Sequence, residues 1–124
     1  FANSIRKFTR DGAELLVNIS NDSWYGRSAA REQHLLIARM RAVENGRWIL
    51  RATNDGVTAA IGPAGRVVDS LPSYVQGALD VRFEYRAELT GFVRYGQWLW
   101  LLCVLVTAMR LGWGGALARR RALR

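Results

Sequence analysis

An uncharged apolar run near the C-terminus limits what this chain can fold into more than any other feature. Residues 98–109 read WLWLLCVLVTAM, and the mostly apolar stretch extends over 22 residues, from Gln97 to Ala118. As an α-helix these residues would measure about 33 Å, whereas the hydrocarbon core of a bilayer is about 30 Å thick. We therefore predict a transmembrane helix over residues 96–118.

The residues within and after this run indicate how it would sit in a membrane. Arg110 lies in the second half of the run, from which a long side chain can reach the nearer headgroups. Trp98 and Trp113 stand towards opposite ends, as in interfacial aromatic belts, and the cluster 119–121 is entirely Arg. The positive end predicts a cytoplasmic C-terminus and a periplasmic location for residues 1–95. The alternative is a buried helix of about twelve residues with a solvated basic end.

The net charge of +8 is concentrated in this C-terminal part. Residues 1–95 hold 13 basic and 10 acidic side chains, whereas residues 96–124 hold five Arg and no acid. Nucleic-acid-binding domains spread their positive charge along a docking surface. The distribution therefore favours a membrane over a nucleic-acid partner.

Composition narrows the remaining classes. A hydrophobic content of 50% argues against disorder, and the single cysteine, Cys103, excludes an internal disulfide and a multi-thiolate zinc site within one chain. Neither a phosphate-binding loop nor metal-ligand spacing occurs, so we expect no cofactor and no metal. The sequence starts at Phe1 rather than Met, and its elements are few for a closed sheet. We expect a piece of a longer protein.

The first 95 residues predict a layered α/β (α+β) domain. Apolar spacing and turn residues predict helices over 1–10 and 29–45 and strands over 15–19, 48–53, 57–61, 66–70 and 79–83. We expect strand 15–19 to be buried on both faces. In helix 29–45, Ser28 is the expected N-cap and Gly46 the end, and the residues expected to point inward are Leu36, Ile37, Met40 and Val43.

Two loops that follow predicted strands are candidate site walls, because α/β sheets place ligands at such positions. In the first, Asn21 and Asp22 provide polar groups, and Trp24 and Tyr25 provide an apolar wall. The alternative for that loop is an ordinary Asx turn with two packing aromatic residues, and composition alone favours this alternative. The second loop contains Asn54 and can also be a plain hairpin turn.

Two further side chains, in the long helix, allow more than one interpretation. Glu44 lies close in sequence to several arginines, so a buried ion pair or a solvated face would account for it. His34, the only histidine, is predicted to be a hydrogen-bonded packing or surface residue rather than a catalytic one.

Four co-linear segments resemble the apolipoprotein N-acyltransferases. They are LVNISNDSWYG at 16–26, QHL at 33–35, ARMRAVENGR at 38–47 and LRATNDGVTA at 50–59. The Arg-Ala-x-Glu-Asn and Thr-Asn-x-Gly patterns recur throughout the nitrilase (carbon–nitrogen hydrolase) superfamily. The Asn-Asp-x-Trp-Tyr-Gly loop, together with the terminal membrane helix, narrows the resemblance to the acyltransferases. Gln97 departs from the family, which usually has an acid there.

The resemblance implies an inner-membrane enzyme with a periplasmic nitrilase-like αββα sandwich, of which this chain is the C-terminal part. Such enzymes move an acyl chain from a phospholipid to a Cys thiol, and then to the N-terminal amine of a diacylglyceryl-modified lipoprotein. The family's catalytic Glu, Lys and Cys lie upstream of the matched segments, and neither Lys7 nor Cys103 matches them. The residues expected to line or support the site are Asn21, Asp22, Trp24, Tyr25, Glu44 and Asn54.

The sequence thus predicts a periplasmic part of a nitrilase-like domain over 1–95, a membrane helix over 96–118 and a basic cytoplasmic tail over 119–124. The expected partners are a phospholipid acyl donor, a lipoprotein and the membrane. One alternative is a membrane-anchored nitrilase-like amidase. The other is a non-enzymatic basic module that docks on anionic lipids or nucleic acid, with salt-sensitive binding.

Overall fold

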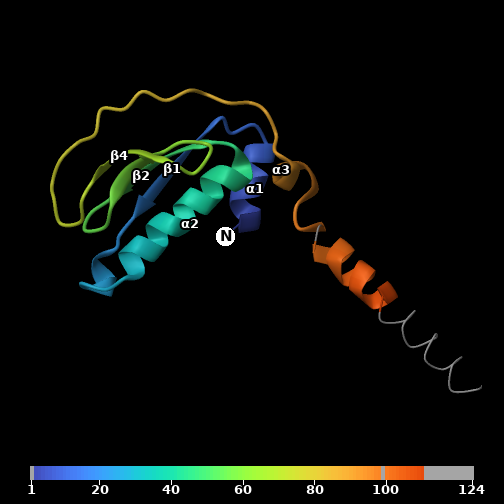
Figure 1. Cartoon of the computed structure of the whole chain (residues 1–124). Coiled ribbons are helices and arrows are strands. Elements are labelled where there is room, and N and C mark those ends of the chain that lie inside the picture. The colour runs from blue at the N-terminus through green and yellow to red at the C-terminus, as the bar shows by residue number, and fades with distance from the viewer. Residues whose placement is uncertain (1, 99, 111–124) are drawn as a thin grey trace, which may run out of the picture. The chain divides into compact units, whose positions relative to one another are not determined.

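The computed structural model describes residues 2–98 and 100–110 of the chain. The chain divides into two compact units, Phe1–Arg94 and Tyr95–Arg124. The elements in chain order are α1 (Ala2–Arg10), β1 (Leu15–Ser20), the 3₁₀ turn η1 (Ser23–Tyr25), α2 (Ala30–Asn45), β2 (Trp48–Thr53), β3 (Thr58–Ile61), β4 (Val67–Leu71) and α3 (Gly91–Tyr95) (Figure 1). The helices predicted over 1–10 and 29–45 and the first four predicted strands are confirmed to within a residue or so at each end.

The four strands form one mixed sheet in the order β1-β2-β3-β4. β1 and β2 are parallel and are joined by α2, whereas β2, β3 and β4 are successively antiparallel. β4 therefore runs in the same direction as β1 and β2, and all three end at one edge of the sheet. We call this edge, where Ser20, Thr53 and Leu71 lie, the carboxyl edge. The N-terminus of α2 lies at the same edge, because this helix follows β1 and leads back to the start of β2.

The core lies between α2 and one face of the sheet. Ala38 and Ala42 of α2 pack against Ile49, Ala59 and Ile61 of the strands, and all five are buried. Two small alanines let the helix approach the sheet closely. α1 packs beside α2 and completes the helical layer (Figure 1).

The prediction of the inward face of α2 is wrong. Leu36, Ile37, Met40 and Val43 are each about half exposed. α2 carries apolar side chains on two sides, and the sheet packs on the side with Ala38 and Ala42. Apolar periodicity identifies both sides but does not say which one meets the sheet.

The expectation that strand 15–19 is buried on both faces is also wrong. Val17 is 65% exposed and Ile19 is 82% exposed. β1 is the edge strand of the sheet, and among the described residues the helical layer covers only the opposite face. The apolar side chains at these two positions are therefore left uncovered.

The ends of α2 give one correction and one confirmation. The N-cap position is Ala29, which makes no side-chain cap hydrogen bond, and the Ser28 hydroxyl accepts only a long bond of 3.4 Å from the Ala30 N–H. At the other end Gly46 terminates the helix with φ 60°, a left-handed conformation that glycine adopts at little cost.

The strand predicted over 79–83 does not form, and residues 76–90 contain neither helix nor strand. Alternating apolar residues favour a strand, but a strand also needs a neighbour to pair with. The end of the segment is instead held by Arg47, which donates to Glu88 O at 2.6 Å. Arg47 also donates to Ala13 O, just before β1, at 2.7 Å. Burial, and then the nearby charge of Arg86, lowers the pKa of Arg47, but a guanidinium remains protonated in proteins.

The second unit contains helical residues at 100–110. They fall within the predicted membrane span 96–118. In the part of the chain that the structure describes, no helix has both the length and the apolar character needed to span a bilayer. Residues 99 and 111–118 of the predicted span, including Trp113, and the basic tail 119–124 lie outside the described residues.

Candidate functional site

The two loops predicted as site walls meet at the carboxyl edge. Asn54 Nδ2 donates to Asn21 Oδ1 at 2.8 Å, and the backbone N–H of Asp22 donates to Asn54 Oδ1 at 3.1 Å. Asn21 Oδ1 also accepts from the N–H of Ser23 at 3.1 Å and from its hydroxyl at 2.6 Å. The side chains of Asn21 and Asn54 therefore bind the loops after β1 and β2 into a single wall.

Asp22 is the buried centre of this wall. Its carboxylate is fully buried and accepts from Ser20 Oγ at 2.5 Å, from His34 Nδ1 at 3.1 Å and from Arg51 Nη2 at 2.7 Å. Arg51 also donates through Nη1 to Asn18 Oδ1 at 2.5 Å. We call Asn18, Ser20, Asp22, His34 and Arg51 the Asp22 cluster. It links β1, its loop, α2 and β2.

The Asp22 carboxyl is held in its charged form. Burial by itself raises its pKa, but the hydrogen bonds from Ser20 and His34 and the positive charge of Arg51 together lower the pKa below the ordinary value. Since Arg51 is also buried, each of the two charges compensates the other away from water.

Gly56 allows the second loop to come this close to Asp22. The glycine is buried, and a Cβ built at this position would overlap the Asp22 carboxylate. The loop sequence Thr53-Asn54-Asp55-Gly56 therefore needs a residue without a side chain at its last position.

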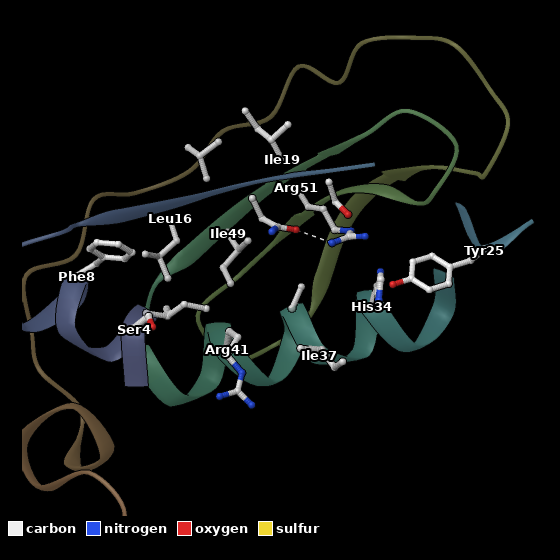
Figure 2. Close-up of a pocket in the computed structure, with 15 residues that line it drawn as sticks. Ser4, Phe8, Leu16, Ile19, Tyr25, His34, Ile37, Arg41, Ile49 and Arg51 are labelled. Atoms are coloured by element: carbon white, nitrogen blue, oxygen red, sulfur yellow. Dashed lines mark hydrogen bonds between the residues drawn. The ribbon is translucent and has the colours of Figure 1, made fainter. Parts of the chain in front are cut away.

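A groove of about 640 Å³ runs from α1 to the Asp22 cluster. The side chains of Ile5, Phe8, Leu16, Ile37 and Ile49 contribute to its apolar part. Its polar lining includes Asn18, Ser20, Tyr25, His34 and Arg51. Figure 2 shows Leu16, Ile49 and Arg51 on the side of the sheet that faces α2, with Ile19 on the other side.

The two aromatic residues predicted as an apolar wall behave differently. Tyr25 lines the groove and packs edge-on against His34, with ring centroids 5.0 Å apart. Trp24, its neighbour in η1, is 85% exposed. Tyr25 therefore lies in the wall, and Trp24 lies on the surface.

Glu44 lies near the other end of α2. It forms an ion pair with Arg41, with 2.6 Å between Arg41 Nη1 and Glu44 Oε2, so the ion pair considered for it in the sequence is present. Ten residues of helix, roughly 15 Å, separate it from His34. Arg41 lines the groove, but Glu44 is not brought together with Asn21 and Asn54. Its contribution to a site stays a prediction.

Arg51 and Asn18 were not identified as site residues from the sequence, and His34 was expected only as a hydrogen-bonded packing or surface residue. A signal was nevertheless present, because Asn18 and Ser20 lie two apart in β1 and so share one face of the sheet. Asn18 also lies opposite Arg51 in the parallel register. A charged residue inside the apolar strand WILRAT is the feature that pointed to a buried partner.

In residues 2–98 and 100–110, the His, Cys, Asp and Glu side chains form no group of three or more that could hold a metal ion. The polar groups that hydrogen bonds position in the described site are the carboxylate of Asp22, the guanidinium of Arg51 and the imidazole of His34.

A comparison with protein families gives a match that includes all four strands of the first unit and ends in the segment after β4. Residues 1–82 match the model of the carbon–nitrogen hydrolases. The chain belongs to the carbon–nitrogen hydrolase family. The match includes every residue of the Asp22 cluster, and the mixed four-stranded sheet with its helical layer fits part of a nitrilase-like fold.

Individual members of the family are similar over most of this chain. The apolipoprotein N-acyltransferase of Azotobacter vinelandii is 46% identical over 113 residues, which cover 90% of this chain and 21% of that protein. Those of Pseudomonas putida and Nitrosomonas europaea are 43% and 48% identical, over 82% and 68% of this chain and over 19% and 17% of their own lengths. The chain thus spans about a fifth of the length of the curated relatives it matches.

Proposed function

We propose that this chain acts as part of an apolipoprotein N-acyltransferase. The reaction transfers an acyl chain from a phospholipid, through a Cys thioester, to the N-terminal amine of a diacylglyceryl-cysteine lipoprotein. Such covalent catalysis divides one acyl transfer into two easier steps. The chain supplies a wall of the reaction site rather than the reacting Glu, Lys and Cys.

The observation that carries this proposal is the similarity to the acyltransferases across the Asp22 cluster. An alignment of 113 residues in a chain of 124 has to include residues 18–54. These residues contain the two loops, the buried ion pair and the helix between them. The similarity therefore covers a structure that fixes polar groups in place, and not only a hydrophobic core.

The proposed contribution of this wall is positional. A site has to hold its groups within fractions of an ångström of the productive geometry, and rigid supporting hydrogen bonds do this. Asp22 and Arg51 hold the ends of β1 and β2, while Asn21 and Asn54 hold the loops that follow. Tyr25 and His34 present the polar end of the groove. The lipid and the lipoprotein are the substrates that this proposal assigns to the intact enzyme.

We further propose that the apolar segment 96–118 crosses the bacterial inner membrane, with residues 1–95 in the periplasm as part of an αββα sandwich. In its described part, residues 100–110 are helical, and Leu101, Val104 and Leu105 are each about half exposed. Exposed apolar patches are typical of surfaces that contact a membrane or another protein.

A chimaeric enzyme tests the proposal. Residues 1–124 replace the matching segment of the Azotobacter vinelandii acyltransferase, and mass spectrometry of a lipoprotein's N-terminal peptide measures N-acylation. We expect the chimaera to acylate the lipoprotein. The chain alone should form no thioester with a phospholipid acyl donor, at Cys103 or elsewhere.

Two results would contradict the proposal. A folded, membrane-inserted chimaera that leaves the lipoprotein amine free would exclude a role in N-acylation. A chimaera that instead hydrolyses amides to free acid and amine would assign the chain to the amidases of the family.

A further inference from the structure

Two arginines converge on one tyrosine at the carboxyl edge, beside the Asp22 cluster. Arg27 lies in the loop before α2 and Arg31 in the first turn of that helix, while Tyr74 follows β4. The guanidinium carbons of Arg27 and Arg31 lie 5.4 and 4.0 Å from the centroid of the Tyr74 ring. The Tyr74 hydroxyl donates to the carbonyl of Gly26 at 3.3 Å, which fastens the ring to the loop.

Arg31 is a buried cation with one donor that is buried and unpaired. It is only 4% exposed, and its Nε has no hydrogen-bond partner. The guanidinium of Arg51 is buried too, but in contrast to that of Arg31 it forms an ion pair with Asp22. Among the described residues, no carboxylate lies within ion-pair distance of Arg27 or Arg31. The face of an aromatic ring attracts a cation, but it offers no acceptor to N–H groups in the guanidinium plane.

The backbone around these side chains also favours an anion. α2 has 16 residues, and its N-cap Ala29 makes no side-chain hydrogen bond. The first N–H groups of such a helix have no partner within the helix, and its N-terminus carries a partial positive charge. The Ala30 N–H makes only the long bond of 3.4 Å to the Ser28 hydroxyl. The one acid in the same turn is Glu32, which is exposed. With two arginines and one acid, the net charge here is positive.

We propose that Arg27, Arg31 and Tyr74, together with the first turn of α2, form a binding site for a phosphate group. A phosphate presents several oxygens to which a planar guanidinium can donate two parallel hydrogen bonds. It would supply the acceptor that Arg31 Nε lacks and would neutralise both cations. The assignment rests on these contacts and does not depend on the proposed acyl transfer. A phospholipid headgroup and a free phosphate share this chemistry.

Calorimetric titration of the full chain in a phosphate-free nonionic detergent tests the site with inorganic phosphate as the probe. Arg31→Gln should weaken binding about tenfold or more, which is the loss of one charge-assisted contact. Arg27→Gln, at an exposed position, should weaken it as well without disturbing the fold. Arg66→Gln is the matched control. It removes the same charge from the turn after β3, at the opposite edge of the sheet, and should leave the affinity within about twofold.

A second titration identifies the source of the phosphate. Tighter binding of glycerophosphoethanolamine, a headgroup without acyl chains, would indicate a phospholipid, and tighter binding of inorganic phosphate would indicate the free anion. Either result supports the site. Absence of binding by both probes would overturn it, and so would equal weakening by Arg31→Gln and Arg66→Gln. Loss of binding in Arg31→Gln with full retention in Arg27→Gln would also contradict the shared site.

Discussion

Asp22 carries a charge where a charge is costly, and the side chains around it explain why it can stay there. Three donors on three different segments reach its carboxylate. The most buried of them, Arg51, also places a full positive charge beside it. A buried ion pair is not in itself a strong source of stability, but breaking one is costly because the remaining charge is left unpaired. Asp22 and Arg51 therefore act as one unit.

Asp22→Asn should lower the free energy of unfolding by about 3 kcal/mol, because Arg51 would remain buried without its counter-charge. Urea unfolding of the full chain in detergent, followed by circular dichroism at pH 7, measures this. Asp80→Asn removes the same charge from an exposed position and should leave the midpoint unchanged. Equal midpoints for the two variants would show that the ion pair contributes nothing.

The lowered pKa of Asp22 makes stability depend on pH in acid. In the folded chain the carboxyl keeps its charge to a lower pH than in the unfolded chain, whose Asp pKa is about 3.9. As the pH falls, the unfolded state therefore binds a proton first and is favoured. The contribution is complete above about pH 5 and is lost as the pH falls through the lowered value.

Unfolding curves at pH 6, 5, 4 and 3 for the natural chain and for Asp22→Asn test this dependence. The difference between the two proteins should narrow as the pH drops from 5 towards 3. A difference that stays constant over this range would mean that the pKa of Asp22 is not lowered by folding.

α2 illustrates, at the scale of an element, what a sequence can and cannot predict. Its existence and its end at Gly46 follow from local spacing and one glycine. Its inward face depends on which side the sheet contacts, and that contact joins residues far apart in the chain. Ala38 and Ala42 are too small to stand out by hydrophobicity, although they are the apolar residues of the helix that are buried against the sheet.

Substitutions on the two faces of α2 distinguish them. Ala42→Leu adds bulk between the helix and the sheet and should cost about 1–3 kcal/mol of unfolding free energy. Leu36→Ala, on the half-exposed side, should cost clearly less. Urea unfolding compares the two, and a greater loss in Leu36→Ala would restore the inward face expected from periodicity.

The candidate site was predictable to a similar extent. Asn21, Asp22 and Asn54 follow apolar strands, so their place at the edge of a sheet could be inferred from order alone. Their direct hydrogen bonds could not, because register decides them. Arg51 was overlooked because a charge within a strand usually marks an exposed position. The apolar residues around it in the strand indicated a buried partner, but which residue that partner is depends on contacts between segments far apart in the chain.

At the scale of the whole molecule, the chain combines a region that matches the carbon–nitrogen hydrolases, residues 1–82, with the apolar segment 96–118. The proposed membrane topology places the last residue, Arg124, in the cytoplasm. A green fluorescent protein fused after Arg124 should fluoresce, and alkaline phosphatase fused there should be inactive, since each reporter works on only one side of the inner membrane. Active phosphatase at this position would reverse the proposed orientation.

The central claim is that the Asp22 cluster positions a wall of an acyl-transfer site. The rate of lipoprotein N-acylation by the chimaeric enzyme, compared between Asp22→Asn and Asp80→Asn at a temperature where both are folded, measures it most directly. We predict that Asp22→Asn lowers the rate about tenfold or more while Asp80→Asn does not, because small displacements of a site cost rate steeply. Equal rates in the two folded variants would contradict the claim.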